Sequence, residues 1–441
     1  MNYEYDPAFR ANEQLAAELM ARTAEAEAAV EPEPDFPSLT AETAARSAPL
    51  SDADAIVAHI ENNHRHGVGV LIERLFGRHP NILSVRSEDH FGGRQDFGAL
   101  HLCIRQPDSA RAAAREAVRK ALGPHTVSRI LSVPFYPADV LNALALKDLF
   151  AVPLATYLMD DQNICEDGIP DNLMRELLER SSLRLAISPE LAVAYEEKYG
   201  RRFWLMPPVA PTRHILDHPL PPEAYLADPA AGAILGNIWG QRWLDLLSET
   251  VRDSGVRLRW HSTNHLRYLS GSIEELAEAG IDIPPGPPLA DRELIAALRR
   301  TAFVVVPTGS LDEQDDRRFI AQLSLPSRIP FILATAHTPF LVVGGERTGA
   351  ARFIRELGLG LAVPYEREAF RKAVGEITRP EVNRRFRRRA LALAARFSDA
   401  GAAEWIWQSL EKGEAFDMRF EDLMRKPRPD VVELVRAGRR P

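Results

Sequence analysis

The stretch FVVVPTGSLDEQDDRRFIAQLSLPSRIPFILATAHTPF, residues Phe303 to Phe340, decides the fold class. Its first four residues form an apolar run that predicts a fully buried parallel strand. The run breaks into a polar loop at Pro307, Thr308 and Gly309. In parallel α/β sheets, loops that follow the carboxyl ends of strands carry the ligand chemistry.

A helix start follows this loop. Five residues form it and combine hydroxyl groups with a guanidinium: Ser324, Leu325, Pro326, Ser327 and Arg328. Backbone N–H groups at the positive end of a helix, with a cation beside them, suit an anion such as a diphosphate. A second strand is expected directly afterwards, over Pro339–Val343. The same pattern also fits an ordinary strand, capped helix and strand of any doubly wound protein.

Length and charge narrow the class of protein. The chain has 441 residues, 45% of them hydrophobic, which is enough for two cores, because a single core stops growing at about 250 to 300 residues. The formal net charge of −8 argues against a general nucleic-acid binder, which needs an electropositive face to displace counterions from phosphate. Two α/β domains and no nucleic-acid partner are therefore expected.

Cysteine usage and hydropathy indicate the compartment. Cys103 and Cys165 are the only cysteines, too few for a disulfide framework, a structural zinc site or an iron–sulfur cluster. The N-terminus lacks the basic start and apolar core of a signal peptide, and no apolar run reaches the ~20 residues that span a bilayer. A cytoplasmic protein is expected, with membrane contact at most peripheral, at the inner face.

Five segments follow one another along the chain. Residues 1–50 are rich in Ala and Glu and predict a helical extension with a Pro-rich linker. Residues 51–210 alternate apolar runs with helical periods, which is typical of βαβ units and a parallel sheet. X-Pro steps make residues 211–230 an extended interdomain linker. The alternation resumes over 231–395, and 396–441 are expected to form helices that pack back.

Two doubly wound domains in series predict a crevice between the carboxyl ends of their sheets, where ligands bind. Helical stretches, such as Ala110–Leu122 and Asp171–Arg180, separate several of the expected strands. The apolar runs interpreted as strands are NILSV near Ile82, Leu100–Ile104, Ser128–Phe135, Pro153–Met159, Leu183–Ser188, Ala233–Ile238, Val256–Ser262, Phe303–Thr308, Pro339–Gly344 and Leu359–Tyr365.

The tail contains the basic sequence NRRFRRRALALAARF, residues 383–397, which predicts an amphipathic helix. Two interpretations fit this helix. It is either a foothold on anionic lipid or a surface helix whose arginine stems cover apolar surface. Trp405 and Trp407 are expected to anchor a terminal helix.

Four segments between about Ile56 and Leu410 share their order and spacing with one enzyme family. They are ISPELAVAYEEKYG (187–200), ILGNIWGQRWLDLL (234–247), GPPLADRELIAALRRTAFVVVPTGS (286–310) and LPSRIPFILATAHTPFLVV (325–343). In this order they resemble the end of the N-terminal domain, the first C-terminal strand with its phosphate loop, the donor loop with its buried strand, and the donor helix of the GT-B glycosyltransferases. Within that group the chain looks like the large retaining family 4.

This resemblance implies two Rossmann-like domains facing each other across a cleft, a nucleotide-diphosphate sugar as substrate, retention of configuration, and no metal or other cofactor. Two features depart from the family pattern. An apolar residue near Phe331 or Ile332 takes the place of a second glutamate, and AHTP, residues 336–339, stands where a small Gly is usual. Asp312 and Glu313 fit the role of the first glutamate, a contact to the donor ribose or sugar.

The expected donor residues lie at the ends of the C-terminal strands. Departure of a nucleoside diphosphate places negative charge on phosphate oxygens, so fixed cations aimed there lower the barrier. Arg242 and Arg328 are the candidate catalytic cations. The resemblance and their positions make the following residues candidate donor ligands: Gly236, Asn237, Trp239, His261, Ser262, Thr308, Gly309, Glu313, Ser324, Pro326 and Ser327.

The expected acceptor residues lie in the N-terminal domain. Asp160 and Asp161 end a buried strand, and one of them can take the proton of an acceptor hydroxyl or bind its hydroxyls. The alternative is that this acidic pair caps the next helix. A Gly-x-Gly ahead of a helix lets the backbone approach a ligand, so His66, Gly67 and Gly69 are candidate acceptor-binding residues.

The sequence does not favour a metal site. His64 and His66 have no nearby set of further ligands. The literal Asp-x-Asp, Asp52 to Asp54, lies at the start of an expected helix, whereas the metal-dependent GT-A enzymes carry this motif after a central strand.

Three hypotheses follow. The first is a transferase that moves the donor sugar to a glycan, a lipid-linked acceptor or a small molecule. The second is an epimerase or hydrolase of the same fold, which turns over the donor with no acceptor present. The third is a catalytically silent scaffold that binds a glycan or a partner protein.

Overall fold

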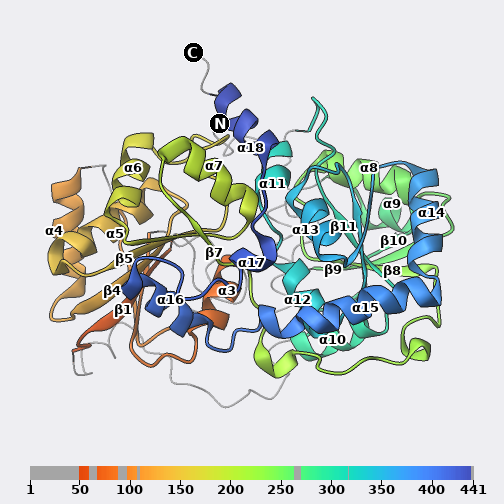
Figure 1. The fold of residues 1–441 in the computed structure, drawn as a ribbon, viewed down its shortest axis with the longest axis horizontal. Helices are drawn as coiled ribbons and strands as arrows, with labels where there is room; N and C mark the ends of the chain where they lie inside the picture. Colours follow the sequence, from red (N-terminus) through yellow and green to blue (C-terminus); the bar gives the residue numbers. More distant parts are fainter. Residues whose placement is uncertain are drawn as a thin grey trace. The chain divides into compact units, whose positions relative to one another are not determined.

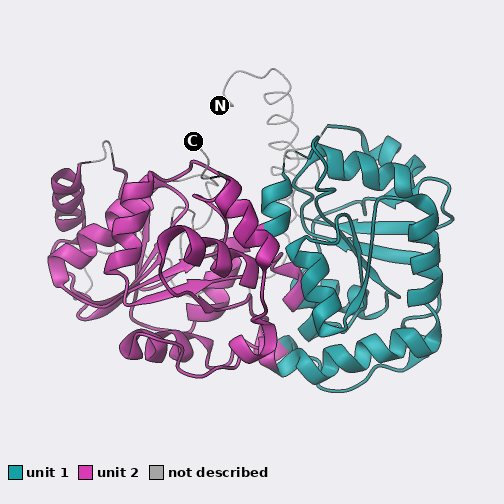
Figure 2. Ribbon diagram, turned by 45° about the horizontal axis from the view of Figure 1, so that its top comes forward, with its two compact units in different colours: residues 1–36, 214–322, 331–395 teal, residues 37–213, 323–330, 396–441 magenta. Residues whose placement is uncertain are grey.

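The computed structural model describes residues 49–58, 67–87, 97–106, 110–262, 270–315 and 317–438. Contacts divide the chain into two compact units (Figure 2). Unit 1 contains residues 1–36, 214–322 and 331–395, and unit 2 contains residues 37–213, 323–330 and 396–441. The expected N-terminal helical extension lies almost wholly outside the described residues.

Unit 2 is built on a seven-stranded parallel sheet with strand order β3-β2-β1-β4-β5-β6-β7 (Figure 1). The order reverses between β1 and β4, and loops at such a switch point bind ligands in doubly wound sheets. Its elements up to the linker are β1 (Ala53–Ala58), α3 (Gly67–Phe76), β2 (Ile82–Arg86), β3 (Leu100–Cys103), α4 (Arg111–Leu122), β4 (Val127–Val133), α5 (Pro137–Phe150), β5 (Leu154–Leu158), α6 (Asp171–Arg180), β6 (Leu183–Ala186), α7 (Pro189–Tyr199) and β7 (Trp204–Leu205).

Strand β1 corrects the sequence analysis, which wrongly places Asp52–Asp54 at the start of a helix. Ala53 and Asp54 are the first residues of this central strand, which pairs with both β2 and β4. The Asp54 carboxylate accepts two hydrogen bonds from Arg129 of β4, at 2.6 and 2.9 Å. Burial of all six β1 residues between two neighbouring strands therefore outweighs the capping tendency of aspartate.

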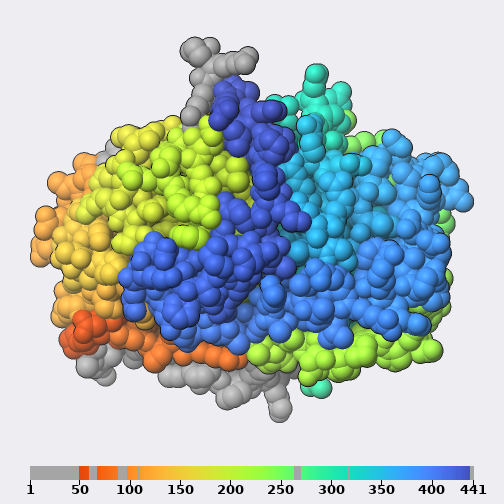
Figure 3. All heavy atoms as spheres, in the orientation of Figure 1, coloured from red at the N-terminus to blue at the C-terminus, as the bar shows by residue number. Residues whose placement is uncertain are grey.

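The C-terminal helices of unit 2 pack back on its α/β layers. They are α16 (Ala402–Lys412), α17 (Glu421–Met424) and α18 (Pro429–Gly438), dark blue in Figure 3. Helix α16 packs against α3, α17 against β7 and α18 against α7. Trp405 and Trp407 are both buried. The centre of the Trp407 ring lies 5.3 Å from that of the Phe76 ring on α3. The guanidinium of Arg129, a residue of β4, lies 4.3 Å from the centre of the Trp407 ring. The prediction that these tryptophans anchor a terminal helix is confirmed.

Unit 1 is built on a six-stranded parallel sheet with strand order β10-β9-β8-β11-β12-β13. From β8 the chain adds β9 and β10 on one side, and it then returns to add β11, β12 and β13 on the other side. The strand order therefore reverses between β8 and β11, which makes this the switch point of the sheet. Its elements are β8 (Ala231–Leu235), α8 (Gln241–Val251), β9 (Arg257–His261), α9 (Ile273–Glu278), β10 (Ile281–Asp282), α10 (Asp291–Arg299), β11 (Val304–Pro307), α11 (Arg318–Leu323), α12 (Arg328–Thr335), β12 (Phe340–Val343), α13 (Gly349–Leu357), β13 (Gly360–Val363), α14 (Arg367–Ile377) and α15 (Pro380–Ala394). Short 3-10 turns lie at Thr212–His214, Pro222–Ala224 and Ala395–Phe397.

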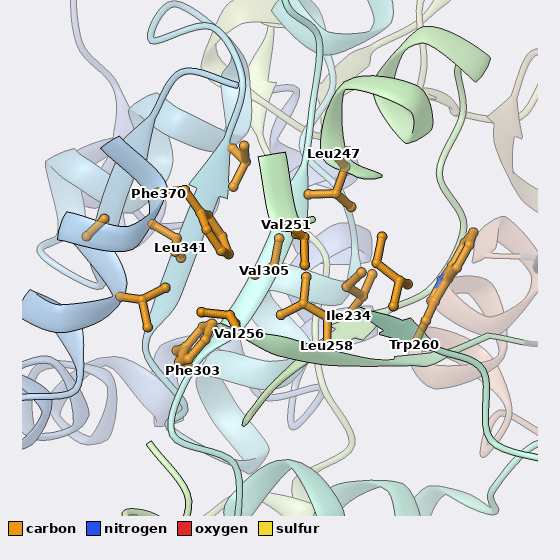
Figure 4. Close-up of a cluster of buried hydrophobic side chains, with 14 of the residues drawn as sticks. Ile234, Leu247, Val251, Val256, Leu258, Trp260, Phe303, Val305, Leu341 and Phe370 are labelled. Atoms are coloured by element: carbon orange, nitrogen blue, oxygen red, sulfur yellow. The ribbon is translucent and has the colours of Figure 1, made fainter. Parts of the chain in front are cut away.

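The core of unit 1 lies between its sheet and the helices that cover it (Figure 4). Ile234, Val305 and Leu341 come from β8, β11 and β12, and all three are buried. Leu247 of α8 and Phe370 of α14 pack against this cluster. The expected buried strand after Phe303 is therefore confirmed as β11, and it fixes where the following loop begins.

The basic tail sequence forms α15, which confirms the predicted helix. Val382, Phe386 and Leu393 on this helix are buried in the core of unit 1 or beside it. In the described part of the chain, no helix combines the length and apolar character needed to cross a membrane.

Candidate functional site

The switch point of unit 1 brings three loops to one edge of its sheet. Ala233 of β8 pairs with Val304 of β11, and Val304 pairs with Phe340 of β12. Because all these strands are parallel, the loops that follow them leave from the same edge. We call the loops 236–240, 308–315 and 344–348 the switch-point loops.

The loop after β8 gathers four of the predicted donor residues. Gly236 adopts φ +80°, a region that favours glycine, and its N–H donates to the His261 carbonyl at 2.8 Å. The Ser262 hydroxyl donates to Asn237 Oδ1 at 2.7 Å. The Trp260 indole N–H holds the Gly236 carbonyl at 2.8 Å. The structure therefore brings Gly236, Asn237, His261 and Ser262 together at the carboxyl ends of β8 and β9.

Arg242, the predicted cation of this loop, forms an ion pair with Asp312. Its Nε lies 3.0 Å from Asp312 Oδ1, and its Nη2 lies 2.5 Å from Oδ2. The hydrogen bond from Arg242 lowers the pKa of Asp312 below its usual value, so this carboxylate stays ionised. Arg242 lies in the first turn of α8, and its Nη1 stays outside the pair. Any anion bound at this guanidinium would therefore share it with Asp312.

A second carboxylate, Asp315, fixes the loop after β11. It is buried and accepts the indole N–H of Trp243 at 2.9 Å. It also accepts the backbone N–H of Leu311 at 3.0 Å and of Arg317 at 3.1 Å. Asp315 is not among the residues predicted from the sequence, because nothing in the local sequence shows that an indole 72 residues away reaches it.

Two glycines permit the close packing of these loops. A Cβ on Gly309 would lie 2.7 Å from Asp315 Oδ2, and one on Gly344 would lie 2.7 Å from the Thr308 carbonyl. Gly344 also adopts φ +143°. Thr308 itself is buried, and its carbonyl accepts the hydroxyl of Tyr365 at 2.6 Å. By contrast, the predicted donor residues Trp239 and Glu313 are exposed, with 41% of the Trp239 surface accessible.

The segment Leu323–Pro330, here called the Ser324 segment, belongs to unit 2. The sequence analysis places it in the second domain, with 231–395, but its contacts group it with the first. The Ser188 hydroxyl at the start of α7 donates to the Leu323 carbonyl. The Ser324 hydroxyl donates to Asp160 Oδ1 at 2.7 Å. The Ser324 segment therefore lies at the carboxyl ends of β5 and β6.

Asp160 is the candidate proton acceptor at the carboxyl ends of β5 and β6. It is partly buried, and burial raises its pKa to about 6. The hydrogen bond from Ser324 lowers the pKa, and the neighbouring charge of Asp161 raises it. A carboxylate that is half protonated near pH 6 can accept a proton at neutral pH and release it again.

Asp161 has a different environment. Its Oδ1 accepts the backbone N–H of Ile164 at 2.8 Å and that of Asn163 at 3.1 Å, and its Oδ2 accepts that of Cys165 at 2.8 Å. The Tyr195 hydroxyl donates to it at 3.2 Å. These four donors use the carboxylate to hold the turn after β5. The alternative interpretation, that the acidic pair caps the next helix, does not describe Asp161, because α6 begins only at Asp171. Asp161 instead stabilises the turn that follows β5.

The predicted glycine loop is in fact the start of helix α3, which corrects the sequence analysis. Gly67 is the first residue of α3, and Gly69 is buried within its first turn. A Cβ on Gly67 would lie 3.8 Å from the Ser327 hydroxyl, so this helix start faces the Ser324 segment. His66 lies outside the described residues.

The remaining predicted residues lie on the same segment. Pro326 and Ser327 precede α12, and Arg328 is its partly buried first residue. Ser324, Ser327 and Arg328 thus follow one another on the Ser324 segment, and Ser324 donates its hydrogen bond to Asp160. Within the described ranges, no cluster of three or more His, Cys, Asp and Glu side chains has the arrangement of a metal site.

Comparison with known proteins shows which solved structures share this fold. No protein-family model and no curated protein sequence matches the chain. The crystal structure of HepE from Anabaena in complex with UDP and glucose matches with a TM-score of 0.56 and 13% identity, over 82% of this chain and 100% of that chain. Sucrose-phosphate synthase from Thermosynechococcus elongatus matches with a TM-score of 0.53 and 14% identity, over 82% and 98%. The predicted GT-B fold is confirmed.

Proposed function

We propose that this protein is a glycosyltransferase that moves a sugar from a nucleoside-diphosphate donor to a glycan, lipid-linked or small-molecule acceptor. One observation carries the proposal. Asp160, whose pKa is raised to about 6, accepts a hydrogen bond at 2.7 Å from Ser324, and Ser327 and Arg328 follow on the same segment. A proton acceptor thus contacts, through Ser324, a segment whose hydroxyl and guanidinium groups suit a departing diphosphate.

The switch-point loops of unit 1 support a nucleotide site. Parallel sheets bind ligands at this position, and Arg242 offers a guanidinium at the N-terminal turn of α8. HepE, a structural neighbour, holds UDP and glucose in its crystal structure. We therefore expect the nucleoside diphosphate at the switch-point loops, with Arg242 contacting a phosphate oxygen.

In the proposed reaction, the acceptor oxygen forms a bond to the anomeric carbon of the sugar. The bond from that carbon to the phosphate oxygen breaks, and the nucleoside diphosphate leaves with its electron pair. The acceptor hydroxyl gives its proton to Asp160, and the guanidinium of Arg328 stabilises the new charge on the phosphate. Retention of configuration, which the resemblance to family 4 implies, is part of the proposal. No metal has a role in these steps.

The test is product analysis with nucleotide sugars, with and without a panel of acceptors. We expect a released nucleoside diphosphate and a glycosylated product only when an acceptor is present. Turnover of the donor without acceptor, to a changed nucleotide sugar or to free sugar, would identify an epimerase or hydrolase. No binding of any nucleotide would identify a silent scaffold. The anomeric proton signal of the product tests retention separately, because an inverted product would leave the transfer itself standing.

A further inference from the structure

Helix α15 carries a strongly basic exposed face on unit 1. Arg384, Arg385, Arg388 and Arg389 are all exposed. Residues four apart lie on the same side of a helix, and 384 and 388 are paired in this way, as are 385 and 389. The four guanidiniums therefore share one face, and we call them the α15 arginine face. In Figure 1, α15 runs along the outside of unit 1.

These arginines are not neutralised by nearby acids. No ion pair joins any of the four to a carboxylate within the described ranges. Arg389 donates to the Leu357 carbonyl at 2.9 Å, and Arg385 lies 5.1 Å from the ring of Phe386. The one acidic residue of α15, Glu381, pairs with Arg379 at 3.8 Å. The positive charge of this face is thus available to a partner, although the whole chain has a net charge of −8.

The composition of the face decides what kind of partner fits. The apolar side of α15 is buried in unit 1, so the helix cannot insert into a bilayer without losing that packing. Its other exposed positions beyond the arginines, Ala392 among them, include no aromatic or amide side chain that could stack on or read a nucleic-acid base. What remains is contact between guanidiniums and a surface of negative charge.

We infer that the α15 arginine face docks this protein on a membrane surface of anionic lipid headgroups, without insertion. Each basic residue held near such a surface strengthens binding by about fivefold, and the effect decays within a Debye length of about 10 Å at 0.1 M salt. The docking is therefore reversible and sensitive to salt. It does not depend on the proposed glycosyl transfer.

The experiment is co-sedimentation of the full chain with vesicles of phosphatidylcholine, with and without phosphatidylglycerol. We expect binding only to vesicles that contain phosphatidylglycerol, and loss of this binding as salt is raised several-fold above 0.1 M. In the double variant Arg384→Gln with Arg388→Gln, binding is expected to weaken by roughly 25-fold. Glutamine keeps a good helix propensity, so α15 is expected to stay folded.

The matched control is Arg257→Gln with Arg355→Gln, which removes the same charge from two exposed arginines that already pair with Asp282 and Glu346. This control is expected to bind vesicles as the unchanged protein does. Equal weakening in both double variants would overturn the inference, because net charge alone would then explain binding. Absence of binding to anionic vesicles, or stronger binding to a single-stranded oligonucleotide than to vesicles, would also overturn it.

Discussion

At the scale of single residues, Asp160 and Asp161 show how two adjacent carboxylates acquire different tasks. Asp161 receives three backbone N–H groups and the Tyr195 hydroxyl, which ties it to the turn after β5. Asp160 receives one hydroxyl, from Ser324, and burial raises its pKa to about 6. The same residue type is thus a structural anchor at one position and a candidate base at the next.

Replacing Asp160 tests its role as base. We expect Asp160→Asn to lower transfer to the acceptor by about 100-fold or more, the usual contribution of a positioned base. In the unchanged protein the rate is expected to fall as pH drops through about 6, because the carboxylate becomes protonated. Rates measured between pH 5 and 8 check both points. Residual activity of Asp160→Asn that still falls near pH 6 would assign the titration to another group.

The control for this change is Asp161→Asn. Loss of the Asp161 carboxylate weakens four hydrogen bonds of the turn, so we expect a lower stability. Because the Asp161 charge raises the pKa of Asp160, the acid limb of the rate profile is expected to persist in Asp161→Asn and to move to a lower pH. An acid limb that disappears in Asp161→Asn and persists in Asp160→Asn would reverse the two assignments.

The ion pair of Arg242 with Asp312 leads to a prediction of opposite effects. Asp312 competes with a diphosphate for the guanidinium, so Asp312→Asn is expected to tighten binding of nucleoside diphosphates several-fold. Arg242→Ala is expected to weaken it by about 10-fold, the loss of one charge-assisted hydrogen bond. Titration calorimetry measures both. Weaker binding in both variants would mean that the pair holds α8 to the loop and that neither charge is free for a ligand.

The sequence predicts part of this candidate site for a clear reason. Gly236, His261 and Ser262 end neighbouring parallel strands, and the order of strands and helices is enough to bring them together. Asp315 and Ser188 could not be predicted in this way. Their partners, Trp243 and Leu323, lie far along the chain, and the contacts depend on how the loops are packed.

At the scale of elements, long apolar runs gave reliable strand predictions and short or charged ones did not. β5, β9 and β12 fall inside the predicted ranges. The two-residue strands β7 and β10 lie outside them, and the first residues of β1 lie where the sequence predicts a helix start. The Ser324 segment shows a further limit. The sequence pattern predicts that these residues begin a helix of the second domain. Only the contacts of this segment with Ser188 and Asp160 show that it belongs to unit 2.

The Ser324 segment yields a prediction about pH. The hydrogen bond from Ser324 lowers the pKa of Asp160, so its removal in Ser324→Ala is expected to raise that pKa further. A hydrogen bond of about 1 kcal/mol corresponds to a shift of about 0.7 units. The acid limb of the rate profile should move upward by about this amount. An unmoved limb would show that Ser324 does not act on Asp160 in solution.

The connection between α12 and β12 contains a buried histidine that couples stability to pH. Burial, with Arg387 nearby, lowers the pKa of His337 to about 4, and its Nε2 has no hydrogen-bond partner among the described residues. The unfolded chain therefore binds the proton first, near pH 6.5, and stability falls as pH drops from about 6.5 towards 4. The loss amounts to at most about 3.4 kcal/mol, because the pKa of His337 lies about 2.5 lower in the folded than in the unfolded chain.

Urea unfolding at several pH values measures this loss. His337→Asn is expected to remove most of the dependence, because Asn tolerates the φ of +57° at this position and does not titrate. The exposed His218, changed to Asn, is the control and should leave the dependence in place. A slope that survives in His337→Asn would assign the acid sensitivity to other groups.

At the scale of the whole molecule, the candidate residues are divided between the two units. The switch-point loops and Arg242 belong to unit 1, and Asp160 with the Ser324 segment belongs to unit 2. The chain runs from the loop after β11 through α11 directly into the Ser324 segment. This connection explains why a sequence motif that looks continuous contributes residues to both units.

A thermal-shift screen against UDP, GDP, dTDP, CMP and ADP tests this division. A ligand that binds only the native state at about 100 times its Kd adds about 2.7 kcal/mol of stability. We expect one diphosphate to raise the Tm of the unchanged protein, and both Arg242→Ala and Arg328→Ala to reduce that shift. Loss of the shift in Arg242→Ala alone would confine the nucleotide to unit 1 and leave Arg328 without a donor role. No shift with any nucleotide would contradict the transferase proposal itself, since a donor that does not bind cannot be cleaved.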